Sequence, residues 1–229
     1  MQVVRSLLFA LLFYSATAIL AVVGLAASVF GTRPARSVVL FWADLHHWLT
    51  DRVLGIRLEV EGTVPSGPVL IAVKHQSMYE TIEIVRLANT PVIVLKRELT
   101  RIPLFGWMTR RYGVIPVDRG AGAKALRELI VLGRAAVADQ RQVIIYPEGT
   151  RVPPGRTPPL RPGFAGLYRA LGMPVVPVAV DSGRLWGRGL IKRSGTVRFL
   201  VGQPIEAGLD RREIEQRVHA AINALELGP

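Results

Sequence analysis

The sequence predicts an α/β fold, in which a central, mostly parallel sheet is flanked by helices and a membrane-associated helical segment precedes it at the N-terminus. Two observations support this prediction. From residue 57 onward, short apolar runs rich in β-branched residues alternate with helical stretches, and no charged residue occurs between Ser6 and Thr32. Continuous apolar strands separated by helices are typical of a sheet that is buried on both faces.

The apolar N-terminal stretch covers residues 3–30. As a helix it would be roughly 40 Å long, more than the ~30 Å needed to cross the hydrocarbon core of a bilayer. A cleaved signal peptide is the alternative, because Ala26 and Ala27 lie in a sequence that resembles a cleavage site, although the stretch is longer than usual for such a peptide. We expect residues 1–56 to anchor the chain to the membrane and residues 57–229 to form the catalytic domain.

A second apolar stretch, residues 38–54, contains two tryptophans and is too polar to span a membrane comfortably. Because tryptophan favours the membrane interface, we interpret this stretch, with His46 and His47, as interfacial. Arg33 and Arg36 follow the first stretch and Arg5 precedes it. The positive-inside rule therefore predicts that the catalytic part lies on the cytoplasmic face of the inner (plasma) membrane.

The expected strands and helices follow in alternation. Strands are predicted at residues 57–62, 69–73, 91–95, 113–117, 142–146, 175–180 and 196–201. Helices are predicted at residues 77–88, 121–138, 161–171 and 211–225.

A histidine lies where one of these strands gives way to a helix. His75 belongs to the sequence KHQSMYE at residues 74–80. The carboxyl ends of strands in open α/β sheets are where sites form, and a helix N-terminus offers free backbone N–H groups that can stabilise an oxyanion. His75 is therefore a candidate general base.

Glu80 has two interpretations that the spacing leaves equally open. It can close a capping box with Ser77, in which case its role is structural. It can instead accept a hydrogen bond from His75 and orient the imidazole, as the acid of a catalytic triad does. A nucleophilic role for Ser77 is the less favoured alternative, because a serine nucleophile needs its own base.

Two further segments contain candidate binding residues. Lys96 and Arg97 follow a predicted strand, as does the sequence YPEGTR at residues 146–151. Within the latter, Arg151 can grip a phosphate and Glu148 can orient that arginine or a hydroxyl group. Taken alone, each segment is also consistent with a local turn or ion pair.

Taken in order, these segments resemble the glycerolipid acyltransferase family, the group that includes the 1-acyl-glycerol-3-phosphate acyltransferases. The blocks that carry the resemblance are KHQSMYE at 74–80, KRELTRIPLFGW at 96–107, YPEGTR at 146–151 and VVPVAV at 175–180. The chain departs from the family pattern at one position, where Glu80 stands in place of the usual aspartate.

The resemblance implies transfer of a fatty acyl group from acyl carrier protein or coenzyme A to the sn-2 hydroxyl of 1-acyl-glycerol-3-phosphate, forming phosphatidic acid. In this reaction His75 would act as the base and Glu80 would orient it. Direct attack of the hydroxyl on the thioester implies neither a cofactor nor a metal ion. The residues expected to bind the substrate are Lys96, Arg97, Glu148, Gly149, Thr150 and Arg151. An acyl groove would be lined by Phe105, Trp107 and residues 175–180.

The remaining expectations concern partners. The net charge is +12, and residues 151–198 contain nine basic side chains and one acidic side chain. Such a surface attracts anionic lipid, phosphorylated substrates or an acidic carrier protein, whereas no nucleic-acid-binding motif is recognisable. The alternatives are an acyltransferase for another lysolipid, such as lyso-ornithine lipid, and a non-catalytic membrane lipid-binding module. The absence of cysteine excludes disulfides, thiolate metal sites and a cysteine nucleophile.

Overall fold

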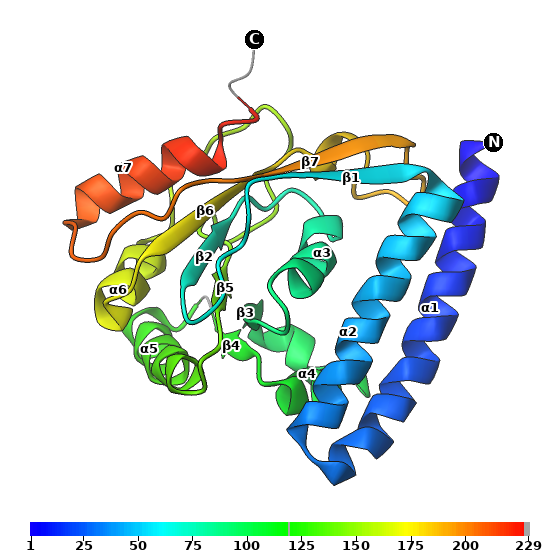
Figure 1. Ribbon diagram of the computed structural model, residues 1–229, viewed down its shortest axis with the longest axis horizontal. Helices are drawn as coiled ribbons and strands as arrows, with labels where there is room; N and C mark the ends of the chain where they lie inside the picture. The colour runs from blue at the N-terminus through cyan, green and yellow to red at the C-terminus, as the bar shows by residue number, and fades with distance from the viewer. Residues whose placement is uncertain (119, 227–229) are drawn as a thin grey trace.

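The computed structural model describes residues 1–118 and 120–226 of the chain. In this part of the chain seven strands form one sheet, in the order β1-β7-β6-β2-β5-β3-β4 (Figure 1). The strands are β1 Ile56–Glu61, β2 Leu70–Val73, β3 Val92–Lys96, β4 Ile115–Val117, β5 Val143–Ile145, β6 Val175–Val180 and β7 Gly195–Val201. Neighbouring strands are parallel except β6 and β7, which are antiparallel. The predicted α/β class is confirmed.

Helices cover both faces of this sheet. They are α3 Tyr79–Leu87, α4 Phe105–Tyr112, α5 Gly122–Ala138, α6 Pro162–Leu171 and α7 Arg211–Ile222. Helices α5, α6 and α7 lie on one face, and α3 lies on the other (Figure 1). The side chains of β2 alternate accordingly, because Leu70 and Ala72 belong to the core beneath α5–α7 whereas Ile71 and Val73 belong to the core beneath α3.

Helix α4 was not predicted, since the sequence around Pro103 and Gly106 resembles a turn. The structure places Gly106 inside the first turn of α4, where a Cβ atom would lie 2.1 Å from the carbonyl oxygen of Thr100. The glycine is required by this close approach of two backbone segments and not by a turn. The periodicity of the sequence does not reveal this close approach between residues six positions apart.

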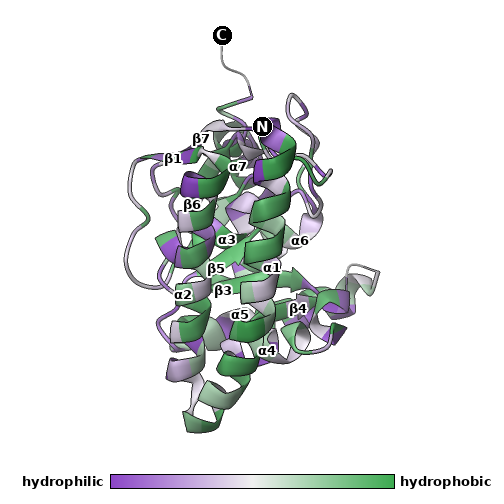
Figure 2. Ribbon diagram, turned by 90° about the vertical axis from the view of Figure 1, so that its right-hand side faces the viewer, coloured by the Kyte–Doolittle hydropathy of each residue, from purple (hydrophilic) through white to green (hydrophobic). Residues whose placement is uncertain are grey.

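The N-terminal residues form two long helices that lie side by side, α1 Gln2–Ala27 and α2 Thr32–Leu49 (Figures 1 and 2). They are joined by a short 3-10 turn, Ser28–Phe30, and by Gly31. The segment Gln2–Phe30 is long and apolar enough to cross a membrane, and only 17% of its most apolar window is buried. Figure 2 shows α1 as predominantly hydrophobic along its length.

The other side of this helical pair packs into the core of the protein. The ring of Phe9 in α1 lies 5.4 Å from that of Trp186, which follows β6, and 6.0 Å from that of His46 in α2. Tyr79 at the start of α3 joins the same group, with its ring 5.7 Å from Trp186. Residue 56 therefore marks a change from helix to strand, while a single apolar core continues across it.

Candidate active site

Three neighbouring strands deliver polar residues to one edge of the sheet. Strands β6, β2 and β5 are adjacent and parallel, so their carboxyl ends meet at the same edge. His75 follows β2, Ser182 follows β6 and Glu148 follows β5. This arrangement brings together residues that lie far apart in the sequence.

The structure joins His75 to Glu80. The Nδ1 atom of His75 lies 2.9 Å from Oε1 of Glu80, whose side chain is completely buried, whereas that of His75 retains 12% exposure. Glu is one methylene longer than the aspartate of the family pattern, and the first turn of α3 places its carboxylate on the imidazole nevertheless.

Glu80 also organises the backbone around the histidine. Its Oε1 atom accepts hydrogen bonds from the backbone N–H groups of Gln76 at 2.9 Å and Ser77 at 2.7 Å. Its Oε2 atom accepts from the hydroxyl groups of Ser77 and Ser182, both at 2.6 Å. The capping and orienting interpretations of Glu80 are thus not alternatives, because one carboxylate makes both sets of contacts.

These contacts decide the charge of Glu80. Burial raises the pKa of a carboxyl group, but here the hydrogen bonds and charge of His75, followed by the bonds from Ser182 and Ser77, outweigh it and leave the pKa of Glu80 below its usual value. An ionised carboxylate can only accept hydrogen bonds, so Nδ1 of His75 carries a proton. The Nε2 atom is then the one with a free lone pair, as a general base requires.

The same network limits what the neighbouring groups can do. The hydroxyl of Ser77 donates to Glu80, lies 2.9 Å from the hydroxyl of Ser182 and accepts from the backbone N–H of Tyr79 at 3.0 Å. No bond joins Ser77 to His75 among the described residues, so the geometry does not favour a serine nucleophile. The backbone N–H groups of Gln76 and Ser77, candidates for stabilising an oxyanion, are already occupied by Glu80.

Glu148 occupies a different environment from the one expected of a substrate ligand. Its Oε1 atom accepts from Nζ of Lys74 at 2.6 Å, and its Oε2 atom accepts from the backbone N–H of His75 at 3.0 Å. Lys74 also donates to the carbonyl of Arg156 at 2.8 Å and to the side chain of Asn223 at 2.6 Å. The side chains of Lys74 and Glu148 are fully buried. This group therefore holds the backbone of His75 in place and has no surface open to solvent.

The rest of the YPEGTR sequence turns back toward solvent. Gly149 adopts φ +70°, which favours glycine, and is followed by the exposed Thr150 and Arg151. Of the residues predicted to bind substrate, Arg151 lies on the cavity described below. The next residue, Val152, contacts the site, because its backbone N–H donates to the carbonyl of His75 at 2.7 Å.

Lys96 and Arg97 lie at the end of β3, which β5 separates from β2. The Nζ atom of Lys96 lies 3.1 Å from Oε1 of Glu98, and Arg97 pairs with Glu128 of α5. Neither side chain lines the cavity next to His75. The structure therefore does not bring these two predicted residues together with Arg151.

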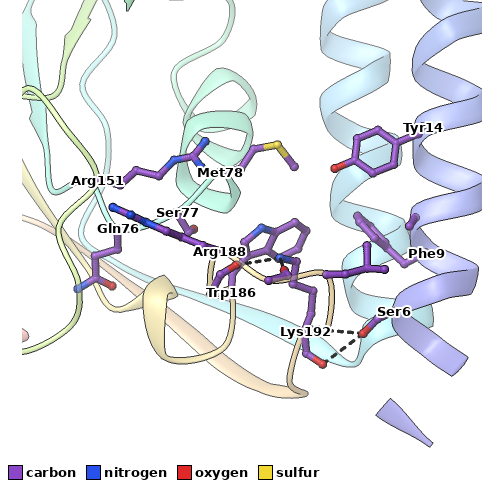
Figure 3. A pocket seen from close by; sticks show the side chains of 14 residues that line it. Ser6, Phe9, Tyr14, Gln76, Ser77, Met78, Arg151, Trp186, Arg188 and Lys192 are labelled. Carbon is purple, nitrogen blue, oxygen red and sulfur yellow. Dashed lines mark hydrogen bonds between the residues drawn. The ribbon is translucent and has the colours of Figure 1, made fainter. Parts of the chain in front are cut away.

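A cavity of about 250 Å³ lies between α1 and the residues that follow His75 (Figure 3). Its wall on the site side includes Gln76, Ser77 and Arg151, and its opposite wall includes Phe9 and Tyr14 of α1. The segment between β6 and β7 closes it with Trp186, Arg188 and Lys192. The sequence analysis missed these last three residues as individuals, although it identified the basic stretch to which they belong.

Two further expectations are corrected. His46 is completely buried and not interfacial, since Nδ1 of His46 and Nδ1 of His47 lie 3.0 and 3.1 Å from the two oxygens of the buried Glu83. Every residue of β6 is buried, so this strand belongs to the sheet core and cannot form an open acyl groove. In both cases the partners come from distant parts of the chain.

Comparison with known proteins agrees with this architecture. Residues 56–181 match the family model described as Acyltransferase. The chain is 36% identical over 195 residues to the 1-acyl-sn-glycerol-3-phosphate acyltransferase of Pseudomonas aeruginosa, an alignment that covers 82% of this chain and 76% of that protein. It is 30% identical over 132 residues to the human 1-acyl-sn-glycerol-3-phosphate acyltransferase alpha, covering 56% of this chain and 47% of the human protein.

The fold is shared with a solved structure. The crystal structure of the 1-acyl-sn-glycerophosphate acyltransferase from Thermotoga maritima superposes with a TM-score of 0.78, at 22% sequence identity. The superposition covers 99% of this chain and 97% of that protein. The N-terminal helical pair is therefore included in the shared fold.

Proposed function

The chain belongs to the Acyltransferase family, and on that premise we propose that it transfers a fatty acyl group to the sn-2 hydroxyl of 1-acyl-glycerol-3-phosphate, forming phosphatidic acid. The relative from Pseudomonas aeruginosa carries this activity in its name and aligns with most of the chain. The substrate is a lysophospholipid, and the reaction belongs to phospholipid biosynthesis.

The observation that carries this proposal is the hydrogen-bonded His75–Glu80 pair at the carboxyl end of β2. Nδ1 of His75 is held by the ionised Glu80, and Nε2 is available to remove the proton of the acceptor hydroxyl. The hydroxyl oxygen forms a bond to the thioester carbonyl carbon, the carbon–sulfur bond breaks, and the thiolate leaves with the proton that His75 has taken. The imidazolium formed in between is stabilised by Glu80.

This mechanism requires neither an acyl-enzyme nor a cofactor or metal ion. The acyl donor is a thioester of acyl carrier protein or of coenzyme A. The basic stretch between residues 151 and 198 favours the acidic carrier protein, because it contains nine basic side chains and one acidic side chain. Comparison of the two donors at low and high salt would test this preference, since docking of a carrier protein to a basic surface weakens as salt increases.

We further propose that the enzyme is attached to the cytoplasmic face of the inner membrane. The exposed side of α1 supports attachment, since many of its apolar side chains face outward, among them Leu7, Leu11 and Val22. Arg33 and Arg36, after the apolar segment, outnumber Arg5 before it, which supports the cytoplasmic face.

The test is an assay of the purified full chain with a radiolabelled acyl donor and a panel of lysolipids. Wild type is expected to convert 1-acyl-glycerol-3-phosphate to phosphatidic acid, and His75→Ala is expected to lose at least about a hundredfold in kcat. Equal product from His75→Ala and wild type would contradict the mechanism. Product from lyso-ornithine lipid alone would contradict the acceptor, and no product from any lysolipid would indicate a non-catalytic binding module.

A further inference from the structure

Positive charge is concentrated on one side of the cavity that is lined by Gln76 and Ser77, the two residues after His75. Arg151, Arg188 and Lys192 line it, and no aspartate or glutamate does. Within the described part of the chain none of these three side chains forms an ion pair with a carboxylate. Figure 3 shows Arg151 and Arg188 close to Gln76 and Ser77, the residues that follow the candidate base.

Lys192 is the one of these three cations whose side chain is held by hydrogen bonds among the described residues. Its Nζ atom donates to the carbonyl oxygens of Gly187 at 2.9 Å and Gly189 at 2.6 Å, and it lies 4.9 Å from the ring centroid of Trp186. An ammonium group has three donors, so these two bonds leave one N–H free for a ligand. The fold thus positions this charge before any substrate is present.

The segment that carries Lys192 is fixed to the membrane-associated helix. The backbone N–H of Lys192 donates to the hydroxyl of Ser6 in α1 at 2.9 Å (Figure 3). Trp186 lies against Phe9 of the same helix. One wall of the cavity is therefore aromatic and apolar, and the other is cationic. A lysophospholipid has matching parts, because its phosphate is anionic and the start of its acyl chain is apolar.

The electrostatics favour an anion in this cavity. Burial lowers the pKa of Lys192, and the nearby charge of Arg151 lowers it further. Two cations held close together without a carboxylate repel one another, and an anion placed between them relieves that repulsion. A volume of about 250 Å³ is below the ~300–1,000 Å³ of pockets that enclose a whole drug-sized ligand, so it suits a headgroup and leaves an acyl chain outside.

We propose that Arg188 and Lys192 bind the phosphate of the acceptor together with Arg151, and that they make the enzyme selective for a phosphomonoester headgroup. This inference rests on the proposed function and adds to it the specificity-determining residues. A phosphomonoester carries between one and two negative charges near neutral pH and offers three acceptor oxygens, which three converging cations can satisfy. A phosphodiester with a choline or glycerol substituent offers fewer charges and needs more space.

The test compares Arg188→Gln, Lys192→Gln and Lys192→Arg in the full-length enzyme. For 1-acyl-glycerol-3-phosphate, each Gln variant is expected to raise KM about tenfold or more while kcat changes less than about twofold, because a ground-state contact to a charged group is lost. Lys192→Arg keeps the charge and is expected to recover most of the loss. Arg193→Gln is the matched control, since Arg193 is the exposed neighbour of Lys192 and does not line the cavity.

A second acceptor separates charge recognition from loss of structure. Activity with 1-monoacylglycerol, which lacks the phosphate, is expected to be lower in wild type and to be unchanged by Arg188→Gln or Lys192→Gln. Wild-type KM values for 1-acyl-glycerol-3-phosphate in both Gln variants would overturn the inference while leaving the proposed function intact. An equal rise of KM for both acceptors would also overturn it, whereas an inactive wild type would overturn the proposed function itself.

Discussion

Glu80 accepts hydrogen bonds from Nδ1–H of His75 and from the backbone N–H of Ser77 on the same carboxylate oxygen, at 2.9 and 2.7 Å. Glu80 therefore links the conformation of residues 75–77 to the orientation of the candidate base. Its negative charge stabilises the imidazolium of His75, and its two oxygens accept the hydrogen bonds from Gln76 and Ser77. Substitutions that remove one property at a time separate these roles.

Glu80→Gln removes the charge with little change in size. We expect kcat to fall by about 10²- to 10⁴-fold, because the imidazolium of His75 loses its counter-charge and the tautomer is no longer fixed. The KM for the acceptor is expected to change little. Glu80→Asp keeps the charge and is expected to lose less activity than Gln. Steady-state kinetics of the three proteins measure this, and a Gln variant as fast as wild type would refute the assigned role.

Lys74→Met leaves the buried carboxylate of Glu148 without its cation. We expect the free energy of unfolding to fall by about 3–5 kcal/mol, since an unpaired buried charge is strongly unfavourable. The double variant Lys74→Met with Glu148→Gln is expected to be more stable than the single variant, because the orphaned charge is gone. Urea denaturation in detergent measures both. Additive destabilisation in the double variant would mean that the two residues do not act as a pair.

Glu83→Gln tests the pH dependence of the link between α2 and α3. Burial raises the pKa of Glu83, but the bonds and charges of His46 and His47 outweigh it and hold the pKa at about 2, below the ordinary 4.5. Arg86 also faces this carboxylate, at 3.3 Å. A depressed pKa stabilises the fold above pH 4.5, and that stability is lost as the pH falls toward 2.

The difference in unfolding free energy between wild type and Glu83→Gln is therefore expected to be on the order of 3 kcal/mol near neutral pH. It should shrink steadily as the pH is lowered below 4.5. Denaturation curves at several pH values provide the measurement. A difference that stays constant from pH 7 to pH 3 would show that ionisation of Glu83 does not contribute.

Gly149→Ala places a side chain where the backbone adopts φ +70° and where a Cβ atom would lie 2.9 Å from Cγ of Arg161. We expect a loss of stability of about 1–2 kcal/mol from the backbone alone, with more from the contact. Gly155→Ala is the matched control, because Gly155 has φ +77° and no atom near its Cβ position. Thermal melting of both variants should rank Gly149→Ala as the less stable.

Much of the fold is predictable because its signals are local. All seven strands lie within two residues of the predicted runs, since most are short apolar stretches between polar turns and β1 alternates apolar with charged residues. His75 and Glu80 are predictable for the same reason, being five residues apart at a strand end. The spacing left open whether Glu80 caps the helix or orients His75, and the structure shows that its carboxylate contacts both groups.

The remainder depends on contacts that no local pattern contains. Ser182 meets Ser77 across 105 residues, and Lys192 meets Ser6 across 186. The sequence assigned Glu148 to the substrate because its buried partner Lys74 is 74 residues away. The burial of His46 depends likewise on Glu83 in another helix.

The buried bond between Lys74 and Asn223 has a consequence for biosynthesis. The two residues are separated by 149 positions, so at about 5–20 residues per second the ribosome needs on the order of 10 s to supply the partner of Lys74. At the start of that interval the N-terminal helices have already been made, whereas the two sheet neighbours of β2 are completed only when residues 145 and 180 have been added. The apolar N-terminal segment is therefore synthesised before the residues that complete the buried group beneath His75.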